Sequence, residues 1–152
     1  MAIALTETPA ARCARYAKEN HFIGVEVNQH DQIVLRAGHV DAIQMPRPLG
    51  DRVRTELLRL HEPTPTIENI DTGFLTFLTQ RAPTGDSRAV HILPTLFKYQ
   101  AIRTVHGSLI TLPGPSDTRR IWMEEPIDEN RPNFDTLATI VLEAARALPT
   151  AC

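Results

Sequence analysis

The residues best suited to chemistry lie between Leu112 and Arg120, where a glycine, two hydroxyls and two guanidiniums occur together. Backbone N–H groups in such a loop and the guanidiniums of arginine are groups that bind phosphate and carboxylate. The predicted ligand-binding residues are Ser116, Thr118, Arg119 and Arg120. The alternative is a strand-to-strand loop with solvated arginines, and Pro113 and Pro115 favour it because proline has no N–H donor.

Two carboxylates could hold a divalent metal if they stood two residues apart on a strand, since alternate residues share a face. No two acidic residues of this sequence are spaced in that way. Glu124-Glu125 and Asp128-Glu129 are adjacent pairs, whose side chains would face opposite sides of a strand. The spacing therefore argues against two-metal nucleotidyl transfer and indicates solvated acids in a connecting segment.

Three histidines recur every nine residues from His21 to His39, but zinc ligands usually come in short paired spacings, which are absent here. Ser87 and His91 are four residues apart with Asp86 beside the serine, yet no G-x-S-x-G motif is present. The sequence also lacks a P-loop and a G-x-G-x-x-G motif. We therefore expect no metal, no cofactor and no catalytic residue; a histidine metal site is the weaker alternative, and a triad assembled from distant segments stays open.

Three helices are expected to frame these segments. The first begins with the hydroxyl N-cap Thr8, followed by Pro9 at the first helical position, and runs to about Asn20. Apolar residues at helical spacing predict a second helix over about 49–60 and a last one from about 134 or 135 to 148.

Runs of strand-forming residues occur at 23–27, 32–36, 39–45, 67–70, 74–79, 102–105, 109–112 and 121–123. The first three predict an antiparallel meander, and His106-Gly107 predicts a tight hairpin between the runs that flank it. Residues 90–93 and 96–99 are ambiguous between strand and helix. We expect one α+β domain over 1–152, with a mainly antiparallel sheet of about six to seven short strands and three helices.

Composition indicates a globular cytoplasmic protein. The 152 residues are 42% hydrophobic, which is enough for one core without disulfides, and Cys13 and Cys152 do not form a disulfide framework. A net charge of -2 gives no basic footprint, so nucleic-acid binding is not expected. The apolar run from Met1 stops at Thr6, too early for a signal peptide, and no run approaches the roughly 18 apolar residues of a membrane span.

Several segments resemble a known pattern. The ranges 72–78, 106–115 and 120–126, together with 45–53, are similar to small actinobacterial proteins with the motifs S/T-G-x-x-T-F-L, G-x-x-I-x-L-P-x-P and R-x-W. Those proteins loosely resemble the N-terminal domain of bacterial bifunctional DNA primase/polymerases. The acidic metal-binding pair of that family has no counterpart here, and His91 aligns only loosely with its strand histidine. The resemblance therefore implies a degenerate relative that does not polymerise.

Together these observations predict a non-enzymatic cytoplasmic binding or regulatory module, whose partner is another protein or a small anionic ligand. Two alternatives stay open. One is a DNA-associated, primase/polymerase-like protein without the catalytic acids, which would bind DNA in a salt-sensitive manner. The other is a small enzyme whose dispersed residues lie around Ser116, Arg119 and His91.

Overall fold

The computed structural model describes residues 7–82 and 88–148 of the chain. Asp86, Ser87 and Cys152, which entered the sequence predictions, lie outside these ranges. Cys13 is a free cysteine. None of the helices in the described ranges combines the length and the apolar character needed to cross a membrane.

Four helices form within the described residues. They are α1 (Pro9–Glu19), α2 (Arg47–Arg59), α3 (Arg88–Lys98) and α4 (Phe134–Arg146). The start of α1 is as predicted, because the Thr8 hydroxyl accepts a hydrogen bond from the Ala11 N–H at 3.1 Å and Pro9 is in the first turn. α2 also begins at prolines, with Pro46 as its N-cap and Pro48 in the first turn, where a missing N–H breaks no helical bond.

The expectation of three helices is wrong by one, because α3 covers residues whose pattern was ambiguous. Pro94 lies inside this helix, although it lacks the N–H of a normal helical residue. In the sequence this proline divides the apolar residues into two short runs. Leu96 is fully buried, and Ile92 and Leu93 pack partly buried against the same core. Packing against the rest of the protein therefore decides for helix where local sequence does not.

In the part of the chain that the structure describes, eight strands form two sheets, and every strand pairing is antiparallel. The strands are β1 (Val25–Val27), β2 (Ile33–Arg36), β3 (Val40–Pro46), β4 (Thr66–Asn69), β5 (Phe74–Gln80), β6 (Ile102–Arg103), β7 (Leu109–Leu112) and β8 (Arg120–Glu124). One sheet has the order β1-β2-β7 and the other β6-β3-β5-β4-β8. The α+β class is confirmed, whereas one sheet of six to seven strands is wrong.

The predicted hairpin at His106-Gly107 is also wrong. A turn does form there, with Gly107 at φ +87°, but β6 before it pairs with β3 and β7 after it pairs with β2. The chain therefore crosses from one sheet to the other at this turn. In the same way β3 leaves the predicted meander, because β1 and β2 pair with each other while β3 joins the larger sheet. Turn residues predict a reversal of direction but not the strand that becomes the partner.

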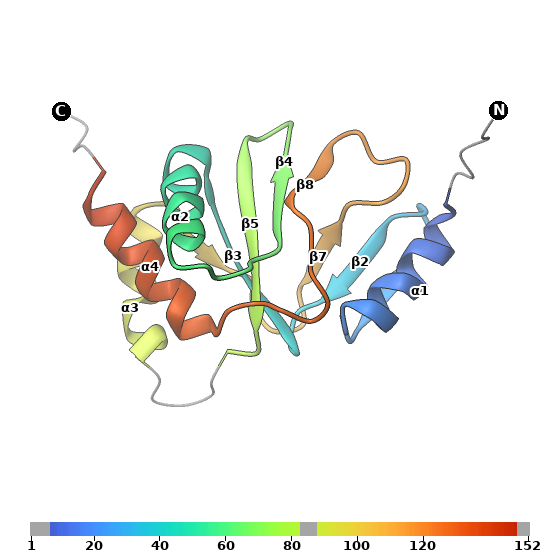
Figure 1. Ribbon diagram of the computed structural model, residues 1–152, viewed down its shortest axis with the longest axis horizontal. Coiled ribbons are helices and arrows are strands. Elements are labelled where there is room, and N and C mark those ends of the chain that lie inside the picture. The colour runs from blue at the N-terminus through green and yellow to red at the C-terminus, as the bar shows by residue number, and fades with distance from the viewer. Residues whose placement is uncertain (1–6, 83–87, 149–152) are drawn as a thin grey trace.

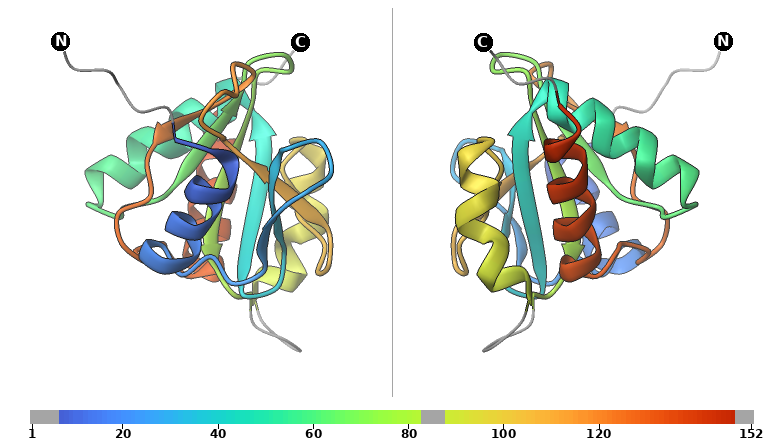
Figure 2. Two further views of the ribbon diagram at one scale, coloured as in Figure 1. Left: turned by 90° about the vertical axis from the view of Figure 1, so that its right-hand side faces the viewer. Right: turned by 90° about the vertical axis from the view of Figure 1, so that its left-hand side faces the viewer.

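The five-stranded sheet is the central layer of the molecule (Figure 1). Figure 2 shows α3 and α4 in front of this sheet from one side, and α1 in front from the other. Along β3 the side chains of Ile43 and Met45 belong to the core beneath the helices, and those of Val40 and Ala42 to the core shared with the three-stranded sheet and α1. Alternation along a strand thus buries both faces of the sheet.

Candidate functional site

The loop predicted to bind an anion joins β7 of the small sheet to β8 at the edge of the large one. Within it, Asp117 Oδ1 accepts hydrogen bonds from the backbone N–H groups of Arg119 at 2.8 Å and Arg120 at 3.1 Å. The Asp117 N–H itself donates to the Gly114 carbonyl at 3.2 Å. The carboxylate of the loop therefore occupies backbone donors that a bound anion would need.

The four residues predicted to bind the ligand differ in their exposure and contacts. Ser116, Thr118 and Arg119 are exposed, whereas Arg120 is partly buried. Arg119 Nη1 lies 2.5 Å from Asp71 Oδ2, and this hydrogen bond raises the pKa of the Arg119 guanidinium. Arg120 begins β8, whereas the other three lie in the loop before that strand. A binding role for all four as one group stays a prediction.

Arg120 lines a groove of about 190 Å³ between the two sheets. Strand register builds one wall, because Gln44 pairs with Thr76 across β3 and β5, and Asn69 pairs with Arg120 across β4 and β8. Directly paired residues have Cβ atoms about 5 Å apart, so each pair presents its side chains together. The polar lining consists of Gln44, Asn69, Thr76, Thr104, Thr111 and Arg120.

The rest of the groove lining is apolar. It consists of Ile67, Phe74, Leu109 and Ile110. Ile67 and Ile110 are only 3% and 6% exposed and belong to the core between the sheets. The groove is therefore built directly on that core, and its walls are strands, which hold side chains more rigidly than loops do.

Arg120 is the single charged residue in this lining. Within residues 7–82 and 88–148 its guanidinium takes part in no ion pair, in contrast to that of Arg119. A guanidinium has five N–H donors, and the surrounding amides and hydroxyls add both donors and acceptors. A carboxylate or phosphate is the group that would complete this arrangement.

The chemistry open to the groove is limited by the groups that line it. No carboxylate, imidazole, thiol or amine is among them. Such groups carry out most proton transfers in enzymes. Nor do the described ranges contain a cluster of three or more side chains that could hold a metal ion. The geometry therefore supports binding through hydrogen bonds and one positive charge.

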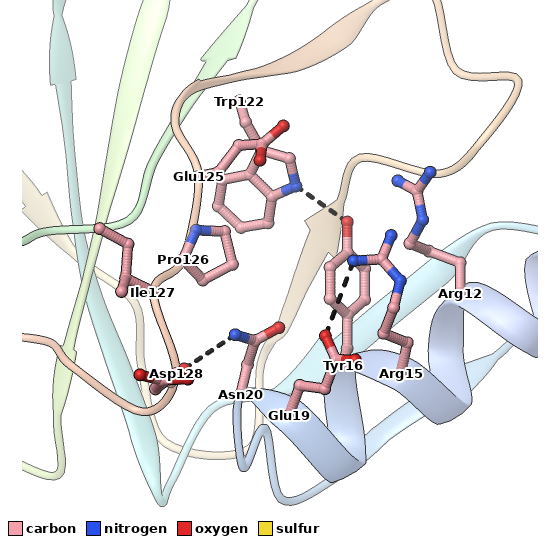
Figure 3. Close-up of a pocket in the computed structure, with 10 residues that line it drawn as sticks. All are labelled: Arg12, Arg15, Tyr16, Glu19, Asn20, Trp122, Glu125, Pro126, Ile127 and Asp128. Atoms are coloured by element: carbon pink, nitrogen blue, oxygen red, sulfur yellow. Dashed lines mark hydrogen bonds and ion pairs between the residues drawn. The ribbon is translucent and has the colours of Figure 1, made fainter.

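A second, wider cleft of about 450 Å³ lies between α1 and the segment after β8 (Figure 3). The Tyr16 hydroxyl donates to the Pro113 carbonyl at 2.6 Å and accepts from Trp122 Nε1 at 2.9 Å. Asn20 Nδ2 donates to the Asp128 carbonyl at 2.8 Å. These bonds join α1 to the loop after β7, to β8 and to the segment beyond it. The polar groups of this cleft therefore stabilise the fold.

The charged side chains of the same cleft are of both signs. Hydrogen bonds from Arg15 and Arg12 hold the pKa of Glu7 at about 2, so Glu7 stays ionised and offsets their charge. Glu19 and Glu125 also line the cleft. The cleft therefore has no excess of positive charge for an anion, unlike the groove at Arg120.

The residues of the dispersed-enzyme alternative lie on different parts of the molecule. His91 belongs to α3, which packs against α4 on the helix-covered side of the large sheet. Ser116 and Arg119 lie in the loop between β7 and β8, on the other side of that sheet (Figure 1). The structure therefore does not assemble these three residues into one site.

Most of the groove was missed by sequence reasoning. Gln44, Thr76 and Thr111 are uncharged residues without a motif around them. One signal was present, because Gln44 is the polar residue at an alternate position of a strand whose neighbours Val40 and Ala42 on the same face are buried. A polar residue on an otherwise apolar strand face is worth testing as a site residue.

Comparisons with protein-family models, with curated proteins and with solved structures found no match to this chain. The resemblance to small actinobacterial proteins and to primase/polymerase domains therefore stays a prediction. A fold alone does not determine a function. The groove at Arg120 is the feature from which function can be inferred.

Proposed function

We propose that this protein is a non-enzymatic cytoplasmic binding module that holds a small anionic ligand in the groove at Arg120. The observation behind this proposal is Arg120, which is a partly buried residue, has no ion-pair partner in the described chain and shares the groove lining with two amides and three hydroxyls. Charges attract each other more strongly where water is partly excluded. A carboxylate or phosphate would therefore bind here more strongly than at an exposed arginine such as Arg119.

The size of the groove limits the ligand. Its volume of about 190 Å³ is below the roughly 300–1,000 Å³ of pockets for drug-sized molecules. A phosphate or carboxylate with a few attached atoms fills such a space, and a larger ligand would extend outside it. The hydroxyls of Thr76, Thr104 and Thr111 can each donate and accept, so a ligand with hydroxyl groups beside its charge suits the lining.

Two further observations support the proposal: the first concerns the binding role, and the second concerns the compartment. The groove lining holds no side chain suited to proton transfer near neutral pH. Cys13 is a free thiol whose pKa is raised by burial, which lowers its thiolate fraction, and a free thiol is compatible with a reducing compartment.

Thermal denaturation with inorganic phosphate, citrate and a nucleoside triphosphate, each at constant ionic strength, tests the proposal. A ligand at 100 times its dissociation constant adds about 2.7 kcal/mol to stability, which for a chain of this length raises Tm by roughly 5–10 °C. Arg120→Gln should abolish the rise. Arg119→Gln is the matched control, since this neighbour lies outside the groove, and it should keep the rise.

Two results would overturn the proposal. One is the absence of a Tm shift with every probe at millimolar concentration. The other is an equal shift in wild type and Arg120→Gln, which would place the anion elsewhere. Sodium chloride at matched ionic strength separates specific binding from general screening of surface charge.

A further inference from the structure

A different surface of the protein exposes apolar side chains instead of polar ones. It is a groove of about 400 Å³ where the end of α3 meets the edge strand β6. Val105 and Phe97 are the two most exposed large hydrophobic residues of the described chain, at 69% and 67%, and both line this groove. Ile102, 47% exposed, and the partly buried Leu93 line it as well. Large hydrophobic side chains that gather in one groove mark an interaction site.

The backbone at this groove is also open. β6 is an edge strand that pairs with β3 only. The Thr104 N–H donates to the Ala42 carbonyl at 2.9 Å, so the backbone groups of Arg103, one residue earlier, point away from β3. Exposed edge strands can pair with another chain. β6 is only two residues long, so apolar contacts have to supply most of the affinity.

The segment of the chain that forms this groove lacks acidic residues. The 29 residues from 88 to 116 contain no Asp or Glu. Lys98 is exposed on α3 beside Phe97 and forms no ion pair in the described chain, and His106 is in the groove lining. Arg103 also lines the groove, but its guanidinium is compensated by Asp41, 3.6 Å away and only 2% exposed. Lys98, next to Phe97 in the sequence, thus has no carboxylate partner among the described residues.

We propose that this surface, defined by Phe97, Lys98, Ile102, Val105 and His106, docks a segment of another protein in which apolar side chains alternate with carboxylates. The apolar side chains of the segment would cover the groove, with Phe97 as an aromatic anchor. Its carboxylates would pair with Lys98, which favours the correct partner and speeds association.

A second copy of this chain is a less suitable occupant. Two copies related by a two-fold axis would place the same surface against itself. The apolar side chains would then be covered, but the second copy would add another Lys98 to the interface and no carboxylate from this surface to pair with it. Like charges placed together disfavour a complex, whereas an acidic segment neutralises them.

Fluorescence anisotropy with the full-length chain tests this surface. The probe is a labelled peptide that alternates Glu with Leu, and the controls alternate Lys with Leu and Glu with Ser. We expect the Glu-Leu peptide to bind about tenfold more tightly than either control, because it alone combines the charge with the apolar side chains. Phe97→Ser and Val105→Ser should each weaken it by about tenfold. Ile23→Ser, a change at a residue that is 56% exposed but outside the groove, should leave binding unchanged.

The proposal fails if no peptide binds, if the Glu-Leu and Lys-Leu peptides bind equally, or if Phe97→Ser and Val105→Ser leave binding intact. Sedimentation velocity adds a further test, because a dimer that Val105→Ser dissociates would mean that a second copy covers the groove. Both replaced side chains are largely exposed, so the variants should fold, and melting curves check this. Both variants should also keep the anion-induced Tm rise, which makes this test independent of the groove at Arg120.

Discussion

Arg120 lies directly opposite Asn69 in the antiparallel pairing of β4 and β8. Its neighbour Arg119 contacts Asp71 in the exposed turn between β4 and β5 instead. In extended backbone, adjacent side chains point to opposite sides, so two chemically identical residues have different surroundings. One arginine pairs with a turn carboxylate, and the other has no ion-pair partner in the described part of the chain.

Asp41 and Asp71 each pair with an arginine, one in a buried place and one on the surface, so they can be compared to test how burial affects the contribution of an ion pair to stability. Asp41 is 2% exposed, lies 3.6 Å from Arg103 and accepts a hydrogen bond from the Ala82 N–H at 2.6 Å. Asp41→Asn should lower the free energy of unfolding by about 3 kcal/mol, because the partly buried Arg103 loses its partner. Asp71→Asn, in an exposed pair, should cost less than about 1 kcal/mol. Urea denaturation measures both losses. Equal losses would contradict the expectation that burial of an ion pair affects stability more than the distance between its charges does.

Glu7 should link stability to pH. Its pKa is lowered from 4.5 to about 2 by hydrogen bonds from Arg15 and Arg12. A lowered folded-state pKa stabilises the protein above the unfolded value, and that contribution is lost as pH falls from about 4.5 through 2. Wild type should therefore be more stable than Glu7→Gln at pH 7, and the difference should shrink below pH 4.5. Urea denaturation across this range measures it.

The control for this prediction is Glu19→Gln. Glu19 is more exposed than Glu7, and its carboxylate lies 4.0 Å from the Arg15 guanidinium, which is a longer contact than that of Glu7. Its loss should therefore change stability little at any pH. A difference between wild type and Glu7→Gln that stays constant down to pH 2 would show that the charge of Glu7 is not the cause.

Tyr16 should be needed to hold α1 in place. Tyr16→Phe removes the acceptor of the Trp122 indole N–H and the donor to the buried Pro113 carbonyl. Leaving buried polar groups unpaired costs about 1–3 kcal/mol, so Tm should fall. Tyr99→Phe removes the same hydroxyl from a partly buried ring with no hydrogen bond to the described residues, and it should be close to neutral. A similar Tm for both variants would argue against the role of the Tyr16 hydroxyl.

Gly50 should tolerate no side chain, although it lies in a helix. A Cβ added there would meet Leu75 Cδ1 at 2.6 Å, because α2 packs closely on β5. Gly50→Ala should therefore destabilise by about 1–3 kcal/mol, which exceeds the roughly 1 kcal/mol gain in helix propensity. Gly114→Ala meets only Ile33 Cδ1 at 3.9 Å and should change stability little. Thermal denaturation distinguishes the two, and a stabilised Gly50→Ala would contradict the close packing.

Local signals alone were enough for several elements of this fold. Thr8 and Pro9 mark the start of α1, and the glycine of the turn at 71–73 separates β4 from β5 as predicted. The last helix begins at Phe134, within the predicted range. In each case the deciding contacts are between residues close in sequence, so a single segment contains the information.

Only the tertiary structure decided the number of sheets, the state of α3 and the composition of the groove. Gln44, Asn69 and Arg120 come from three strands, and their meeting depends on which strands pair and in which register. Those choices follow from burying both faces of the central sheet, which involves contacts between segments far apart in the chain. The sequence by itself determined the α+β class and named Arg120 only as one of four residues predicted to bind an anion. The pairing of distant strands decided that this arginine, and not Arg119, lies in the groove.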